Sequence, residues 1–199
     1  MPELPEFKAI IFDMFGVIVP DTSWVYFDRH KADFGGDADY LANLNEQIDK
    51  DQITDAQYFK SLERKLIIPA RQIEQEMDEI ETPNQEVVKL IVQLKEQYKI
   101  GLLSNSLDKW LEELLERYAL KGLFDCVISS SKSGYIKPQP EIFQLAVKQL
   151  SVESSQCVFI DDREVNVLAA EALGMRGVLF KDSKHLKTDL QEVLNARIA

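Results

Sequence analysis

Six polar residues follow the apolar runs of this sequence and have side chains that can hold a metal ion and contact a small anion. In chain order they are Asp13, Ser104, Asn105, Lys137, Asp161 and Asp162. Carboxylates bind hard cations such as Mg²⁺ and can also act as nucleophiles. A lysine or a hydroxyl beside them can neutralise or hydrogen-bond an anionic group. These residue types suit chemistry on a small anion, provided that the fold brings them together.

Short, nearly continuous apolar runs predict the buried parallel strands that would position these residues. The runs begin at Ala9, Ile100, Cys126, Cys157 and Gly177. Helical patterns separate most of them, so the sequence predicts an α/β fold with a doubly wound, mostly parallel sheet. In such sheets ligands bind beyond the carboxyl ends of the strands. The polar residues follow those ends, which favours one shared site.

Apolar residues at intervals of three and four predict the helices of this sheet. The helix after the insertion is expected to begin at Thr82 as N-cap, with Pro83 in its first turn. The helix after the paired acids is expected to end at Gly174. Its predicted buried stripe consists of Val165, Leu168, Ala169, Ala172 and Leu173.

The stretch 20–81 contains helical patterns and no strand-like run. Within it, residues 54–57 (T-D-A-Q) have the pattern of a capping box at the start of a helix. The sequence therefore predicts a core domain formed by residues 1–19 and 82–199, with residues 20–81 as a helical cap over the carboxyl edge of the sheet. The cap aromatics Trp24, Tyr26, Phe27 and Tyr58 suit either its core or a pocket.

The acidic balance of the chain, with a formal net charge of −11, argues against nucleic acid as a partner. No apolar stretch approaches the roughly 20 residues of a membrane-crossing helix, and the N-terminal residues lack the apolar segment of a secretory signal. Cys126 and Cys157 lie in strand-like runs and are expected to be buried free thiols. The composition therefore predicts a cytoplasmic protein with no nucleic-acid or membrane partner, and it does not indicate the oligomeric state.

Each polar residue also has a purely structural explanation. Asp13 could begin a turn, and Ser104 could cap the helix that follows it. Lys137 could be a solvated residue ahead of a helix with Pro138 in its first turn. Asp162 could cap the next helix. Because all of them follow strand ends at one sheet edge, a functional site explains the set better.

The order of these residues resembles the motifs of the haloacid dehalogenase (HAD) superfamily of phosphotransferases and hydrolases. Residues 13–17, D-M-F-G-V, resemble its first motif, which is D-x-D-G followed by Val or Thr. Ser104 resembles the second motif, and residues 137–143, K-P-Q-P-E-I-F, resemble the third. The paired acids 161–162, followed by G-M at 174–175, resemble the fourth.

The resemblance covers about residues 7–182 and implies a specific chemistry. Asp13 would attack phosphorus and form an aspartyl-phosphate, which water then hydrolyses. The implied substrate is a small phosphorylated metabolite. The implied Mg²⁺ ligands are Asp13, the backbone carbonyl of Phe15, and Asp162, with Asp161 adjacent.

The remaining residues of the resemblance bind the phosphoryl group or support the metal ligands. Lys137 would neutralise both the nucleophile and the phosphoryl oxygens. Ser104 and the neighbouring Asn105 would bind the phosphoryl group. Asn166, one helical turn beyond the paired acids, would hydrogen-bond the metal ligands.

Phe15 departs from the first motif, where phosphatases of the family usually have a second aspartate. That aspartate protonates the leaving oxygen and then activates water, and such help is worth ~10²–10⁴-fold. Phenylalanine can do neither. A substitute acid from the cap would be Asp21, Asp28 or His30.

Three functions therefore remain open on the sequence alone. The first is a Mg²⁺-dependent phosphatase. The second is a haloacid dehalogenase, in which Asp13 attacks carbon and expels a halide that needs no proton. That branch typically has a Tyr at the position of Phe15, but it uses no metal, and Asp161 and Asp162 would then crowd like charges beside Asp13. The third is a non-catalytic member that binds a ligand or a partner.

Overall fold

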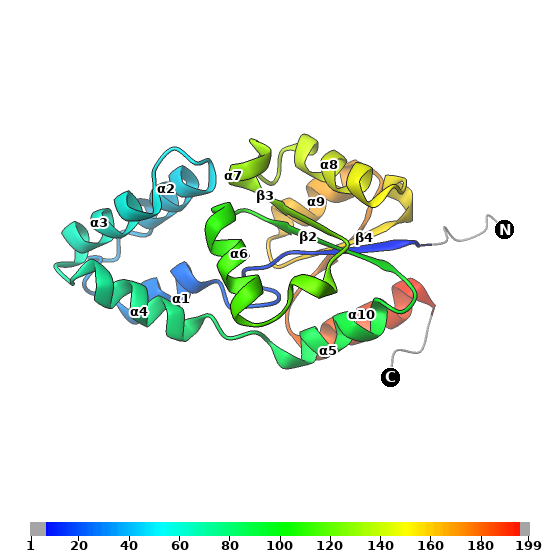
Figure 1. Ribbon diagram of the computed structural model, residues 1–199, viewed down its shortest axis with the longest axis horizontal. Helices are drawn as coiled ribbons and strands as arrows, with labels where there is room; N and C mark the ends of the chain where they lie inside the picture. Colours follow the sequence, from blue (N-terminus) through cyan, green and yellow to red (C-terminus); the bar gives the residue numbers. More distant parts are fainter. Residues whose placement is uncertain (1–6, 196–199) are drawn as a thin grey trace.

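The computed structural model describes residues 7–195 as a five-stranded sheet with helices on both faces and further helices beyond one edge (Figure 1). Residues 1–6 and 196–199 lie outside the described residues. They include most of the N-terminal stretch expected to lack a secretory signal, and both ends of the predicted core domain.

The sheet is parallel throughout and runs in the order β3-β2-β1-β4-β5. Its strands are β1 (Ala9–Phe12), β2 (Lys99–Ser104), β3 (Cys126–Ser129), β4 (Cys157–Asp161) and β5 (Arg176–Leu179). Every residue of β1 and β4 is buried. Strands covered on both faces need apolar side chains at every position, which explains the continuous apolar runs. The predicted doubly wound α/β fold is confirmed.

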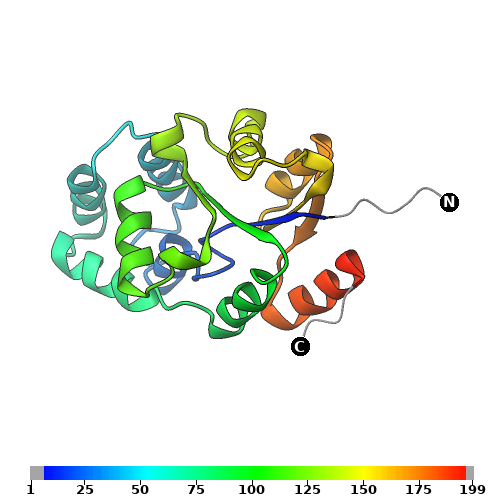
Figure 2. The same ribbon diagram turned by 45° about the vertical axis from the view of Figure 1, so that its right-hand side comes forward.

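Helices cover the two faces of the sheet, as the two views show (Figures 1 and 2). One face packs against α5 (Gln85–Leu94), α6 (Asp108–Arg117) and α10 (Ser183–Leu194). The other packs against α8 (Pro140–Leu150) and α9 (Glu164–Ala172). The short elements are α7 (Ser130–Ser133) and the 3₁₀ turns η1 (Lys121–Leu123) and η2 (Ser154–Gln156). This arrangement leaves the carboxyl ends of the strands uncovered by these layers.

Between β1 and β2 the chain forms the inserted helices, which lie beside the sheet in Figure 1. They are α1 (Thr22–Arg29), α2 (Ala38–Asp49), α3 (Asp55–Leu66) and α4 (Ala70–Ile80). Their buried apolar residues form a core of their own, centred on aromatic side chains such as Tyr26, Phe27 and Tyr58. The expected capping box at Thr54 is present and fixes the start of α3.

The structure corrects two helix details. The N-cap of α5 is Asn84, whose side chain accepts the backbone N–H groups of Glu86 and Val87, and not Thr82. Three residues of the stripe predicted for α9 are exposed: Val165 by 49%, Leu168 by 56%, and Ala172. Its buried residues are Asn166, Val167 and Ala170.

The reason for the second correction lies in what α9 packs against. Asn166 donates hydrogen bonds to Asp161, and this contact turns the helix by part of a turn from the expected orientation. Gly177 of β5 gives the helix room, because a Cβ atom there would lie 2.5 Å from Cγ1 of Val167. A polar contact from the site therefore decides which face is buried. As expected, Gly174 follows the end of the helix with a positive φ of 88°.

Cys126 and Cys157 are both buried free thiols, as expected. Among the described residues, no helix combines the length and apolar character needed to cross a membrane.

Candidate active site

Asp13 lies at the carboxyl end of β1, in the middle of the sheet. Its backbone N–H donates to the carbonyl of Ile160 at 2.9 Å, so the β1–β4 ladder continues up to this residue. The residue is 5% exposed, and its Oδ1 accepts the backbone N–H of Met14 at 2.7 Å. A buried carboxylate with one such hydrogen bond requires a further positive partner.

Lys137 provides that partner. Its Nζ lies 2.7 Å from Oδ1 of Asp13 and 2.7 Å from Oδ2 of Asp161. The loop that carries it is held by Asn105, whose side chain accepts the backbone N–H of Lys137 at 2.8 Å and donates to its carbonyl at 3.0 Å. Asn105 therefore positions the lysine backbone, in addition to any direct contact with a ligand. Neither Ser104 nor Asn105 caps α6, and Pro140 instead of Pro138 occupies the first turn of α8.

The two acids of β4 differ in how fully they are hydrogen-bonded. Nδ2 of Asn166 donates to both carboxylate oxygens of Asp161, at 3.0 and 3.1 Å. The backbone N–H of Arg163 also donates to Asp161, at 2.9 Å. Asp162 has a buried Oδ1 with no hydrogen-bond partner among the described residues. Asp162 also does not cap α9, where Arg163 is the N-cap residue without a side-chain bond.

Gly16 allows the Asp162 carboxylate to approach the turn after β1. Its φ is +91°, and a Cβ atom there would lie 2.4 Å from Oδ2 of Asp162. A side chain at this position would displace the carboxylate or the turn. The glycine of the first motif thus has a steric role that the sequence pattern does not state.

The cluster of Asp13, Asp161 and Asp162 fits a cation. Their carboxylates each offer an oxygen, and these oxygens lie within 4.8 Å of one another. Lys137 supplies one positive charge against three carboxylates. Oδ1 of Asp162, which has no hydrogen-bond partner among the described residues, can bind a further positive ligand. A divalent ion such as Mg²⁺ matches a site made of hard oxygen donors.

The pKa values follow from this crowding. Burial raises the pKa of Asp13 well above its ordinary value; the charges of Asp161 and Asp162 add to the rise, and Lys137 opposes it. Burial and the charge of Asp161 raise the pKa of Asp162 to about 6. Burial also acts to raise the pKa of Asp161, but the charge and hydrogen bond of Lys137 outweigh it, so that pKa is lowered. Bound cations would favour the charged form of all three.

Ser104 is fully buried at the end of β2, and its Oγ has no hydrogen-bond partner among the described residues. The same is true of the Oγ of Ser106. Ser106 lines the cavity described below, whereas Ser104 does not. Two unpartnered buried hydroxyls at one strand end suit a polar ligand, because buried polar groups in native proteins are normally hydrogen-bonded.

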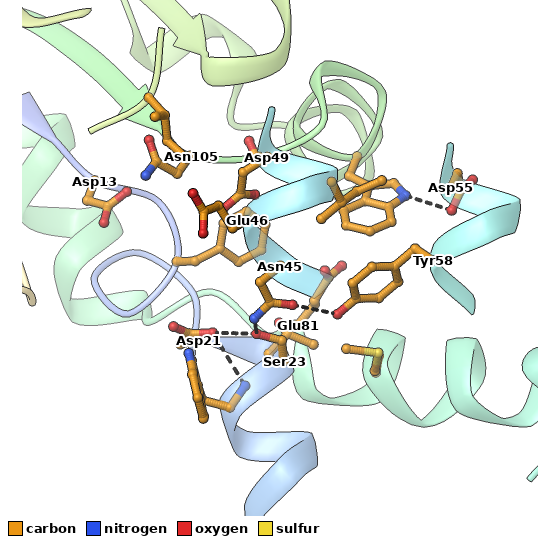
Figure 3. Close-up of a pocket in the computed structure, with 18 of the residues that line it drawn as sticks. Asp13, Asp21, Ser23, Asn45, Glu46, Asp49, Asp55, Tyr58, Glu81 and Asn105 are labelled. Atoms are coloured by element: carbon orange, nitrogen blue, oxygen red, sulfur yellow. Dashed lines mark hydrogen bonds between the residues drawn. The ribbon is translucent and has the colours of Figure 1, made fainter. Parts of the chain in front are cut away.

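A cavity of about 490 Å³ lies between the carboxyl edge of the sheet and the inserted helices (Figure 3). On the sheet side it is lined by Asp13, Phe15, Asn105, Lys137 and Asn166. On the other side Trp24 and Tyr58 line it, while Tyr26 and Phe27 belong to the core of the inserted helices. Neither Asp161 nor Asp162 lines the cavity, and Asp161 contacts Lys137, which does.

The sequence analysis named Asp21, Asp28 and His30 as possible substitute acids. Of these three residues, only Asp21 lines the cavity. His30 is bound between Asp33 and Glu76 and stacks on Tyr26. Asp28 is exposed and does not line the cavity. Asp49 does line it, at the end of α2 in Figure 3, and sequence reasoning did not select it. No motif marks Asp49, because only the packing of α2 places it there.

The family of the chain follows from comparison with known proteins. The family model of haloacid dehalogenase-like hydrolases matches residues 7–174. The chain belongs to this family of hydrolases.

Individual relatives are more distant. The chain is 26% identical to a sesquiterpene phosphatase from Aspergillus oryzae, with coverage of 94% of this chain and 97% of that protein. It is 32% identical to a glyceraldehyde 3-phosphate phosphatase from Pyrococcus furiosus over 49% of this chain and 41% of that protein. A HAD family enzyme from Bacteroides thetaiotaomicron, solved with magnesium and inorganic phosphate, matches with a TM-score of 0.67 and 22% identity, covering 90% of this chain and 98% of that one.

Proposed function

We propose that this hydrolase is a Mg²⁺-dependent phosphatase of a small phosphorylated metabolite and that it acts through an aspartyl-phosphate at Asp13. The observation that carries the proposal is the buried cluster of three carboxylates around Lys137 at the end of the central strand. One lysine cannot neutralise three carboxylates, and hard oxygen donors suit Mg²⁺. Asp13, the carbonyl of Phe15 and Asp162, with Asp161 adjacent, would hold the ion.

In the first step an oxygen of Asp13 attacks phosphorus, and the bond from phosphorus to the ester oxygen breaks. Lys137 is bound to Asp13, and together with the ion it would favour the charged carboxylate that attacks, against the rise in pKa that burial causes. Ser104, with its unpartnered hydroxyl, and Asn105 would bind the phosphoryl oxygens. When bound, Mg²⁺ would neutralise the negative charge on the phosphoryl oxygens.

Asn166 is proposed to hold Asp161, which in turn holds Lys137. These contacts keep the lysine in place when the charge on Asp13 is consumed by bond formation. Preorganised charge of this kind accounts for much of the catalysis in phosphoryl transfer.

The organic group of the ester would occupy the cavity under the inserted helices. We propose that residues 20–81 act as a cap domain on a core made of residues 1–19 and 82–199, and that the cap selects this group. The names of the fungal and archaeal relatives support a phosphorylated substrate, and the magnesium and phosphate of the Bacteroides enzyme support the ion. Aromatic residues such as Trp24 and Tyr58 give the cavity apolar surface for an organic group.

One observation favours dehalogenation as a second candidate: Phe15 lines the cavity where a phosphatase of the family usually has its acid. Loss of halide needs no proton. The three clustered carboxylates count against this candidate, because a metal-free site would leave two of their charges without compensation.

The test is a panel of phosphate monoesters and chloropropionate, assayed with Mg²⁺ and with a chelator. We expect release of phosphate that depends on Mg²⁺ and no release of chloride. Chloride release without a metal would establish the second candidate, and no turnover of any compound would favour a binding protein.

A further inference from the structure

The proposed phosphatase lacks an acid at the position where the family usually has one, because Phe15 occupies it. An alkoxide leaving group needs a proton, and the water that later attacks the aspartyl-phosphate must lose one. The group that exchanges these protons must face the cavity, since the leaving oxygen points away from Asp13 toward it. Carboxylates that line the cavity meet this requirement.

Most of these carboxylates are already engaged. Asp21 caps α1 and accepts the hydroxyl of Ser23 at 3.1 Å. Asp55 accepts Nε1 of Trp110 at 3.0 Å and Nζ of Lys109 at 2.7 Å. Further pairs are Glu46 with Lys50, and Asp78 and Glu81 with Arg117. Glu74 and Glu113 are exposed to solvent.

Asp49 differs from all of them. It is half-buried at the C-terminal end of α2, and no hydrogen bond among the described residues involves its carboxyl group. It lines the same cavity as Asp13, Asn105 and Lys137, and Figure 3 shows it at the end of α2 nearest Asp13 and Asn105.

The sheet edge itself holds Asp49 in this position. Oγ of Ser130, the residue after β3, donates to the backbone carbonyl of Asp49 at 2.6 Å. The same hydroxyl accepts the backbone N–H of Ser106, two residues after β2, at 3.0 Å. Ser130 is 2% exposed, so this bridge is shielded from water. The end of α2 is thus tied through its backbone to the strand ends that carry the site, and the free carboxyl of Asp49 lines the cavity there.

We propose that Asp49 replaces the missing aspartate as the general acid and then the general base of the phosphatase reaction. In the first step the carboxylic acid of Asp49 gives its proton to the ester oxygen as the bond to phosphorus breaks, and the alcohol leaves. In the second step a water molecule attacks phosphorus and gives its proton to the Asp49 carboxylate. The bond from phosphorus to Asp13 breaks, phosphate leaves, and both side chains return to their starting states.

The protonation state of Asp49 suits both steps. Burial, followed by the charge of Asp21, raises the pKa of Asp49 to about 7, although Lys137 and Arg163 oppose the rise. An acid–base group works best when its pKa lies near the operating pH. The charged or titratable groups that face Asp49 are Asp21 on the α1 side, Glu46 on α2, Tyr58 on α3, Lys137 before α8 and Arg163 before α9.

The experiment compares Asp49→Asn with Asp39→Asn, an exposed residue of the same helix that does not line the cavity. The substrates are β-glycerophosphate, an alkyl ester, and para-nitrophenyl phosphate, whose leaving group needs no proton. For the alkyl ester we expect Asp49→Asn to lower kcat/KM by about 10²-fold and Asp39→Asn to leave it unchanged. The aryl ester should lose much less in the bond-breaking step.

Two further measurements separate an acid–base role from a structural one. In wild type, kcat/KM for the alkyl ester should fall as the pH rises through about 7, and this limb should be absent in Asp49→Asn. With the aryl ester, Asp49→Asn should accumulate acid-stable phosphorylated protein, because hydrolysis of the aspartyl-phosphate lacks its base. Circular dichroism of the variant should match wild type.

This inference rests on the proposed function, and its failure can be told apart from the failure of that function. A wild type that hydrolyses both esters while Asp49→Asn keeps the alkyl rate and the pH limb would overturn the role of Asp49 alone. Equal losses on both esters without accumulation of phosphorylated protein would also overturn it. A wild type that hydrolyses neither ester and is never phosphorylated would overturn the phosphatase itself.

Discussion

The two sides of the cavity are built in different ways. On the sheet side, Asp13, Lys137 and Asp161 form a buried chain of ion pairs at 2.7 Å, held in place by Asn105 and Asn166. On the side of the inserted helices, Asp49 has a free carboxyl, fixed only through its backbone by Ser130. The sheet side is a preorganised electrostatic site. The other side supplies a group that is free to gain and lose a proton.

This difference indicates that the sheet side of the cavity stabilises charge and that the inserted helices provide proton transfer. Fixed charges that must not reorganise belong on strand ends, where the ladder holds the backbone. A proton-transfer group needs a pKa near neutrality, which full ion pairing would prevent. Substitutions on the two sides of the cavity should therefore differ in how they affect alkyl-ester hydrolysis, aryl-ester hydrolysis and metal binding.

The largest effect is expected from Asp13→Asn. The amide is nearly isosteric but is a poor nucleophile, so kcat should fall by about 10⁴-fold or more on both alkyl and aryl esters. The fold should be retained, because the change removes one of three clustered carboxylates. Circular dichroism and the phosphate assay check both points. Equal loss on both esters would contrast with the selective loss in Asp49→Asn, and a loss of folding would leave the assignment of Asp13 without support.

A smaller effect is expected when Phe15→Asp is added to Asp49→Asn. The new carboxylate would restore the D-x-D pattern and should return about 10-fold or more of the lost alkyl-ester rate. In the wild-type background the same change should give little gain, because an acid is already present and removing the ring opens space in the cavity wall. A large gain in the alkyl-ester rate of the Phe15→Asp single variant, with no recovery in the double variant, would show that Asp49 does not act as the acid in wild type.

Metal binding should be a property of the sheet side only. Mg²⁺ should raise the Tm of wild type, and the rise should grow with the logarithm of the Mg²⁺ concentration above the dissociation constant, by the linkage between binding and folding. The shift should be nearly lost in Asp162→Ala and retained in Asp49→Asn. Thermal denaturation at several Mg²⁺ concentrations measures this, and an equal shift in wild type and Asp162→Ala would exclude the proposed ligand set.

The smallest effect concerns stability and pH. The pKa of Asp49 is about 7 in the folded protein and about 3.9 in an unfolded chain, so folding favours the protonated form. Its stabilising contribution is fully present below pH of about 4 and is lost as the pH rises to about 7. Asn cannot ionise. We therefore expect the Tm of Asp49→Asn to exceed that of wild type at pH of about 8 and to match it near pH of about 4. A lower Tm for the variant at the higher pH would show that the ionised carboxylate of Asp49 stabilises the folded protein, which contradicts the raised pKa.

The contrast also explains what the sequence could predict. Asp13, Lys137 and the paired acids each follow an apolar run, and parallel strands bring such positions to one edge, so a local pattern was enough. Asp49 ends an ordinary amphipathic helix. Its place over the cavity depends on a hydrogen bond from Ser130, which lies far along the chain, and no local pattern reports that contact.

The errors in the helices have the same origin. Hydrophobic spacing predicted that Leu168 faces the sheet, but the bond from Asn166 to Asp161 and the close approach of α9 to Gly177 set a different face. At the start of α5, both Thr82 and Asn84 are good N-cap residues, and the structure uses the asparagine. Local patterns identified the strands and most of the helices, while contacts with the rest of the fold set the buried face of α9.

The central claim is that Asp13 carries the phosphoryl group during turnover. Wild type should be mixed with para-nitrophenyl phosphate and Mg²⁺, quenched in acid during turnover, digested, and mapped by mass spectrometry. The account predicts a phosphoryl group on the peptide that contains Asp13, its absence when Mg²⁺ is chelated, and its accumulation in Asp49→Asn. Turnover with no phosphoryl group on that peptide in either protein, or with the group on another residue, would contradict the account.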